Sequence, residues 1–185
     1  MNHHELYKSS REDWILKTFL SLLRKDSTKT SKGNPSLNEP DFIVQHECAS
    51  IGIEVSEVYY SQDDAKENNQ LRKGLDKIPT GETRDGKIPS LEEQVKNPNL
   101  TIDAIVVRRI NERIQEKSAK RYKNISEAWL LLYLDLALFD DRDINLVKSR
   151  IRPKKGGFSR MFLLWANSAE KGGYSFYELG HETVE

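Results

Sequence analysis

The apolar positions of the chain follow a helical period first and a strand period afterwards. From residue 9 to residue 23 they recur three and four positions apart, which predicts an amphipathic helix capped by Ser9 or Ser10. Residues 25–39 are rich in Lys, Ser, Thr, Gly, Asn and Pro, which is typical of an exposed loop. The chain therefore opens with one helix and one long connection.

Two apolar runs follow Pro40 and are predicted to pair as an antiparallel hairpin. Residues 42–45 and 51–60 are rich in β-branched and aromatic side chains, and a short polar break separates them. The second run is the longer one, so we expect it to be a central strand. Residues 61–100 are polar and hold three prolines, which predicts a long insertion.

The second half of the chain predicts one helix and three strands. Residues 101–123 carry an apolar stripe at helical spacing, and residues 128–136 form an apolar run typical of a buried strand. Residues 140–152 are polar and predict no further element. Two more apolar runs, at residues 158–166 and 174–179, predict the last strands. This order predicts an α/β fold.

The amino-acid composition limits the class of protein but does not identify a binding partner. The 29 Lys and Arg residues balance 29 Asp and Glu residues, so only a local patch could attract nucleic acid. The single cysteine, Cys48, excludes an intramolecular disulfide. The longest apolar run, at residues 128–139, is broken by Asp135 and is too short to cross a bilayer. We expect one cytoplasmic domain, residues 1–185, with no membrane partner.

Two acids of the hairpin are expected to converge. Side chains alternate faces along a strand, and a turn near Cys48 and Ala49 would put Asp41 on the same side as Glu54. Two carboxylates held close together repel each other unless a cation neutralises them, and a hard divalent ion takes oxygen ligands. Taken alone, Asp41 after a proline is more typical of a residue that caps a turn.

These residues resemble a known family. Pro40-Asp41, followed thirteen residues after Asp41 by Glu54-Val55-Ser56, is similar to the PD-(D/E)xK motif of restriction-endonuclease-like nucleases. Among them it is closest to bacterial nuclease-like proteins with a Gly-Ile-Glu-Val-(Ser/Thr)-Glu strand. The resemblance implies a three-layer core, with a mixed sheet of about five strands flanked by helices. It also implies a metal-dependent nuclease, with DNA favoured as the substrate, that binds Mg²⁺ or Mn²⁺ through Asp41, Glu54 and the Val55 carbonyl.

The chain departs from this family at the third catalytic position, where Ser56 replaces the usual lysine. In some members of the family the lysine lies instead on the helix that follows the core strand. Lys117 falls on the apolar stripe of that helix, so we expect it to take the catalytic role, with Lys120 as the second choice. Glu12 matches an accessory acid of some relatives, although an acid early in a helix also suits its dipole.

A catalytically inactive nuclease-fold protein that binds nucleic acid or a partner protein is the competing hypothesis. It follows from Ser56, because a hydroxyl cannot supply the positive charge of a lysine. The sequence leaves open whether the nucleic acid is DNA or RNA and whether the protein forms a homodimer. A basic segment supplies the residues predicted to contact nucleic acid, namely Arg150, Arg152, Lys154 and Lys155.

Overall fold

The computed structural model describes residues 3–25, 28–46, 49–59, 96, 101–134, 141–153, 156–167, 170 and 173–180. The predicted insertion at 61–100 lies outside the described residues except for Lys96. Cys48, Lys154 and Lys155 also lie outside them.

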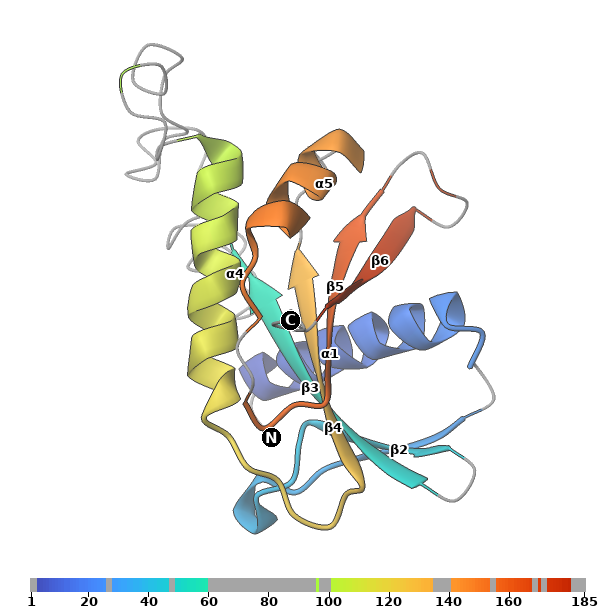
Figure 1. The fold of residues 1–185 in the computed structure, drawn as a ribbon. Coiled ribbons are helices and arrows are strands. Elements are labelled where there is room, and N and C mark those ends of the chain that lie inside the picture. Colours follow the sequence, from blue (N-terminus) through green and yellow to red (C-terminus); the bar gives the residue numbers. More distant parts are fainter. Residues whose placement is uncertain are drawn as a thin grey trace.

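A mixed sheet with the strand order β1-β2-β3-β4-β5-β6 forms the centre of the fold (Figure 1). β2 (Phe42–His46) and β3 (Ala49–Val58) are antiparallel, and β3 is parallel to β4 (Glu127–Leu134). β5 (Arg160–Ala166) is parallel to β4 and antiparallel to β6 (Tyr174–Leu179). The prediction of a mixed sheet is confirmed, with six strands in the described part of the chain instead of about five.

Helices cover both faces of this sheet and make three layers. α4 (Ile102–Ser118) and α5 (Asp141–Arg150) lie on one face, and α1 (His3–Leu22) crosses the other (Figure 1). In β4, the even-numbered residues 128–134 join the core under α4 and α5, whereas the odd-numbered residues 129–133 join the core under α1. The strand alternation thus fills two cores at once, and the predicted three-layer α/β class is confirmed.

The predicted hairpin forms in the expected register. Ile43 pairs with Gly52 and Phe42 pairs with Ile53, so the next position in line, Asp41, lies opposite Glu54. β3 has β2 on one side and β4 on the other, as expected for a central strand. The register therefore brings the two acids to neighbouring positions of the sheet.

An additional edge strand lies where a loop was predicted, so that prediction was wrong. β1 (Lys29–Lys32) pairs antiparallel with β2, and a 3₁₀ turn, η1 (Pro35–Leu37), follows it. All four side chains of β1 are exposed, so the strand carries no apolar pattern. Backbone pairing holds it in place, and a polar edge strand also discourages pairing with another chain.

The helix ends also differ from the prediction. α1 begins at His3, so Ser9 and Ser10 lie inside the helix and cap nothing. Good helix formers precede the two serines, and serine within a helix costs little. α4 ends at Ser118, several residues before the predicted end at residue 123.

α5 was missed because its polar composition hid a short helical period. Ile144 and Val147 are buried against the sheet, and Ile151 continues their spacing. No helix in the described part of the chain is long and apolar enough to span a membrane.

Candidate functional site

The site lies beside the start of β2, where β3 continues past its last pair with β2. The pairing of β2 with β3 begins at Phe42 and Ile53, and in the described chain residues 54–58 of β3 pair with β4 only. Beyond this point the Asp41 side chain replaces a backbone acceptor of β2, because its Oδ2 accepts a hydrogen bond of 2.9 Å from the Val55 N–H. The acid is thereby fixed against the open edge of β3.

The same bond orients the Val55 carbonyl. The N–H and C=O of one strand residue point to the same side of the strand, so the Val55 carbonyl also faces the open edge. Val55 lines the pocket at this edge together with Asp41. The Asp41 carboxylate, from the residue before β2, thus meets the Val55 carbonyl of β3 in one place.

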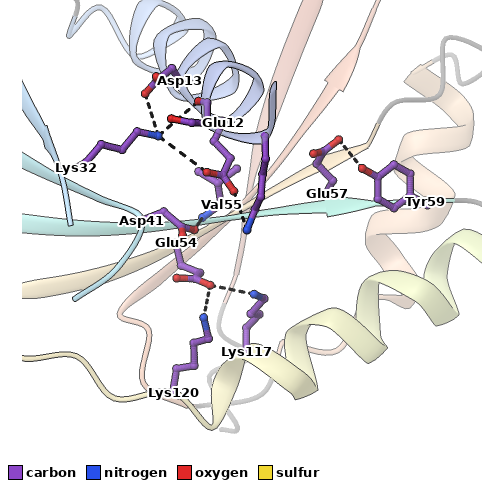
Figure 2. A network of polar contacts seen from close by, with 12 residues as sticks. Glu12, Asp13, Lys32, Asp41, Glu54, Val55, Glu57, Tyr59, Lys117 and Lys120 are labelled. Carbon is purple, nitrogen blue, oxygen red and sulfur yellow. Dashed lines mark hydrogen bonds and ion pairs between the residues drawn. The ribbon is translucent and has the colours of Figure 1, made fainter. Parts of the chain in front are cut away.

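Glu54 lies beside Asp41 and points toward α4 (Figure 2). Its side chain is only 3% exposed, and a buried carboxylate requires partners. Oε1 accepts hydrogen bonds from Lys117 Nζ at 2.9 Å and Lys120 Nζ at 2.5 Å, and Oε2 accepts one from the Tyr122 hydroxyl at 2.6 Å. Lys117 therefore reaches the acid pair, as the helical stripe predicted, whereas its catalytic role stays a prediction.

Tyr122 was not singled out from the sequence. It follows the end of α4, so the helical period gives no information on where its side chain points. Its ring packs on Phe158, with ring centroids 6.0 Å apart, and this contact holds the hydroxyl at Glu54. Burial and the adjacent Glu54 carboxylate raise the pKa of Tyr122, so the hydroxyl keeps its proton and stays a donor.

The environment raises the pKa of Asp41 to about 6. Burial is the main cause, and the negative charges of Glu54 and Glu12 add to it. The hydrogen bond from the Val55 N–H and the charge of Lys117 act in the opposite direction without cancelling these effects.

The pKa of Glu54 moves the other way. Burial alone would raise it, but the hydrogen bonds from Lys120, Tyr122 and Lys117 together outweigh burial and lower it. Glu54 therefore stays ionised while its neighbour Asp41 titrates close to physiological pH. Adjacent carboxylates whose pKa values are pushed apart are typical of functional sites.

One pocket collects most of the predicted site residues. It has a volume of about 250 Å³ and lies between α1 and α4 (Figure 2). Ser56, which is 7% exposed, lies next to Glu54 on the α4 side. The predicted residues that line the pocket are Glu12, Asp41, Glu54, Val55, Ser56, Lys117 and Lys120.

Glu12, the predicted accessory acid, projects from α1 on the opposite wall (Figure 2). Its carboxylate lies 3.5 Å from Lys8 Nζ and 3.9 Å from Lys32 Nζ. Burial raises the pKa of Glu12. The structure therefore brings Glu12 close enough to influence Asp41 through its charge.

Two of the four predicted basic contact residues, Arg150 and Arg152, are described, and neither is at this pocket. Arg150 is paired with Asp103 at 2.5 Å, and the backbone N–H of Arg152 donates to Asn111 Oδ1 at 3.0 Å. Neither arginine lines the pocket. The structure thus does not bring these two arginines to the acids, and their contact with nucleic acid stays a prediction.

The donor set suits a cation that keeps several waters. In the described part of the chain, no three His, Cys, Asp or Glu side chains are grouped so that they could hold a metal ion. Asp41, Glu54 and the Val55 carbonyl would instead provide a small set of hard oxygen ligands. Mg²⁺ is commonly held by one or two carboxylates and completes its coordination with water, so these residues fit it.

Fold and site together define a three-layer α/β protein in which the buried Glu54 and the half-buried Asp41 lie beside the part of β3 that, among the described residues, pairs with β4 only. The chain matches no known protein family, no curated protein and no solved structure in the comparisons made. The functional argument therefore rests on the residues of the site, because function belongs to sites and not to folds.

Proposed function

We propose that the protein is a cytoplasmic, metal-dependent nuclease that hydrolyses phosphodiester bonds in nucleic acid, with DNA the favoured substrate. The observation that carries this proposal is the pair of adjacent carboxylates, Asp41 and Glu54, in one pocket with the ammonium group of Lys117. Two adjacent acids that can hold a metal ion, with a lysine from the facing helix that can stabilise negative charge, can together support phosphodiester hydrolysis.

Asp41, Glu54 and the Val55 carbonyl would hold Mg²⁺ or Mn²⁺. When bound, the ion supplies a Lewis acid for the phosphodiester and lowers the pKa of a water ligand. Asp41 is half-buried and one of its oxygens is held by the Val55 N–H, so its position is set before any cation binds. Preorganisation of this kind keeps the cost of ordering the site small.

Lys117 takes the role that the motif usually gives to a lysine next to the second acid. Its side chain is 17% exposed, and the last turn of α4 anchors it. From there its ammonium group offers a positive charge and hydrogen-bond donors to a phosphate oxygen at the carboxylates. Lys120, at 44% exposed, is the more exposed of the two lysines on Glu54 and is the one that can turn to solvent when a cation binds.

Cleavage assays with the Asp41→Asn protein test the proposal. Wild-type protein should cut single-stranded or double-stranded DNA in Mg²⁺ or Mn²⁺ and lose this activity in EDTA. Removing one carboxylate should lower the rate by at least about 10²-fold, since the lost charge acts directly on the metal. Asp143→Asn, an exposed change on α5, is the matched control and should cut normally. Equal cleavage by the Asp41→Asn protein would contradict the proposal.

A catalytically inactive binding protein is the second candidate, and one observation favours it. Both oxygens of Glu54 already accept hydrogen bonds, from Lys117, Lys120 and Tyr122. A site satisfied by its own lysines can bind nucleic acid without a cation. Calorimetry with Mn²⁺ separates the two candidates. A nuclease must bind Mn²⁺ through Asp41, so the wild-type protein should give a heat of binding that the Asp41→Asn protein does not give.

A homodimer, which the sequence left open, is a further proposal for the free protein. Sedimentation of the purified chain at several concentrations would test it. A single species with the mass of one chain throughout would contradict it.

A further inference from the structure

The α4 wall of the pocket carries a row of cations that ends at the acids. Arg109, Arg113 and Lys117 are spaced four residues apart, and side chains at this spacing are neighbours on one helix face. Arg113 and Lys117 both line the pocket. The row therefore leads from the outer turns of α4 to the Glu54 carboxylate.

Two acids of α4 currently accompany the arginines of this row. Arg109 Nη1 lies 2.9 Å from Glu112, and Arg113 Nη1 lies 2.7 Å from Glu116. The side chains of Glu112 and Glu116 are 51% and 56% exposed. Exposed pairs of this kind contribute little to stability, so a phosphate with several strong acceptor oxygens can compete for the guanidinium groups.

A further cation stands on the α1 wall. Lys8 lines the same pocket, its side chain is 56% exposed, and its Nζ lies 3.5 Å from Glu12. The pocket thus has Asp41 and Glu54 between its walls, Arg113 on the α4 wall, and Lys8 beside Glu12 on the α1 wall. Tyr59, which lines the pocket too, offers an aromatic ring. Cations that follow a phosphate backbone, with an aromatic ring for a base, are the components of single-strand binding sites.

The depth of Glu54 limits what can reach it. Glu54 lines this pocket of about 250 Å³, and its side chain is only 3% exposed. A strand must therefore bend to bring one phosphate to the acids, and a single strand bends far more easily than a base-paired duplex, whose persistence length is about 50 nm. We propose that the pocket receives a single strand, and that Arg113 and Lys8 bind the phosphate next to the reacting one. This inference rests on the proposed function for the metal-binding role of Asp41 and Glu54. The binding of the strand itself does not depend on that role.

Binding assays in EDTA test the inference without requiring cleavage. The probes are a fluorescein-labelled oligothymidylate and a fully base-paired hairpin of the same nucleotide count, with affinity measured by anisotropy over a series of salt concentrations. The oligothymidylate should bind at least about tenfold more tightly than the hairpin. Arg113→Gln and Lys8→Gln should each weaken strand binding and reduce the salt slope by about 0.7.

Arg108→Gln is the matched control. Arg108 is on the same helix, is 58% exposed, lies 4.0 Å from Glu112, and does not line the pocket. It should leave both the affinity and the salt slope unchanged. An Arg108→Gln effect as large as that of Arg113→Gln would show diffuse attraction to the helix and would overturn the inference.

The remaining outcomes separate this inference from the proposed function. Equal binding of hairpin and strand, or an unchanged salt slope in the Arg113→Gln protein, would overturn the single-strand assignment even if the protein cuts DNA. Preferential strand binding that depends on Arg113 and Lys8 would support it even if no cleavage occurs in Mg²⁺ or Mn²⁺. In that case only the nuclease proposal would fail.

Discussion

The two central carboxylates differ because their hydrogen-bond partners differ. Glu54 has three side-chain donors and stays ionised, whereas Asp41 has one backbone N–H and feels the charges of Glu54 and Glu12. The ionised form of Asp41 is therefore unfavourable in the absence of a cation. A buried group that costs stability in the free protein is a common feature of sites built for a ligand.

Replacing Asp41 with Asn should stabilise the metal-free protein at alkaline pH. The pKa of Asp41 is raised from 3.8 to about 6, so the folded state holds more protons than the unfolded state between these values. The wild-type protein accordingly loses stability as the pH rises through this window. The gain from Asp41→Asn should be on the order of 1–3 kcal/mol above pH 6 and vanish below about pH 4.

Urea unfolding in EDTA across this pH range measures the effect. Asp143→Asn, on the exposed surface of α5 and away from the pocket, is the control and should not reproduce this gain in stability above pH 6. A destabilised Asp41→Asn protein at pH 8 would contradict the assignment of a raised pKa.

The two lysines on Glu54 should contribute unequally to cleavage. Lys117→Met removes a mostly buried ammonium group at the pocket, and we expect kcat to fall by about 10²–10³-fold. Lys120→Met removes a group that is 44% exposed and lies beyond the helix, so its effect should be within about tenfold. Steady-state cleavage rates of both variants measure the two losses. A larger loss in the Lys120→Met protein than in the Lys117→Met protein would assign the catalytic role to Lys120.

At the scale of elements, β3 serves both layers of helices through acids on its opposite faces. Glu54 faces the α4 side, while Glu57 lies 2.6 Å from Arg11 of α1 and accepts a 2.8 Å hydrogen bond from the Tyr59 hydroxyl. The strand thus fixes α1 and α4 relative to the open edge. The pocket between the two helices depends on this double attachment.

Gly52 controls how closely the segment before β2 approaches β3. A Cβ at this position would lie 2.6 Å from Pro40 Cγ and 2.6 Å from Ile125 Cδ1. Pro40 immediately precedes Asp41, so a shift of the ring also moves the acid. Gly52→Ala should lower the free energy of unfolding by about 1–3 kcal/mol and weaken any binding that depends on Asp41.

Gly180→Ala is the control for this change, because a Cβ there meets no atom of the described residues within 4 Å. Its effect on the free energy of unfolding should stay within about 0.5 kcal/mol. Urea unfolding compares the two variants, and equal stabilities would show that the approach of Pro40 is not tight in solution.

At the scale of the whole molecule, the net charge of zero makes local geometry decisive. Anions are not attracted by the protein as a whole, so the cations that matter are those held next to the acids. Gly157, which follows the predicted basic contact residues in the sequence, has a structural role instead. Its N–H donates a hydrogen bond to the Ser118 carbonyl at 3.2 Å. This glycine thus packs against the end of α4, and the segment supports the fold at that point.

Binding of Mn²⁺ at the acids should raise the melting temperature of the whole protein. A ligand that binds the folded state alone stabilises it by about 2.7 kcal/mol at a concentration of one hundred times its Kd. The increase should grow with pH up to about 7, because Asp41 must lose its proton, and it should disappear in Asp41→Asn and Glu54→Gln proteins. Differential scanning fluorimetry measures it, and an equal shift in the Glu54→Gln protein would place the metal elsewhere.

The sequence alone determined the features that follow from local periodicity. The strand period put Asp41 and Glu54 on one side of the hairpin, and the helical stripe put Lys117 on the face of α4 that meets the sheet. Both inferences succeeded because a period of two or of 3.6 residues is fixed by backbone geometry wherever the element forms. The six-stranded order needed more than periodicity, since β1 is held by backbone pairing and has no apolar face.

The tertiary structure decided which groups surround the acids. Lys120 and Tyr122 reach Glu54 from beyond the end of α4, where the path of the chain and not a period sets direction. Lys8 and Arg113 become neighbours of one pocket only because α1 and α4 pack on opposite faces of the same strand. Such contacts join residues far apart in sequence and exist only once the layers have packed. The sequence therefore offered Lys120 only as a second choice and did not single out Tyr122, Lys8 or Arg113.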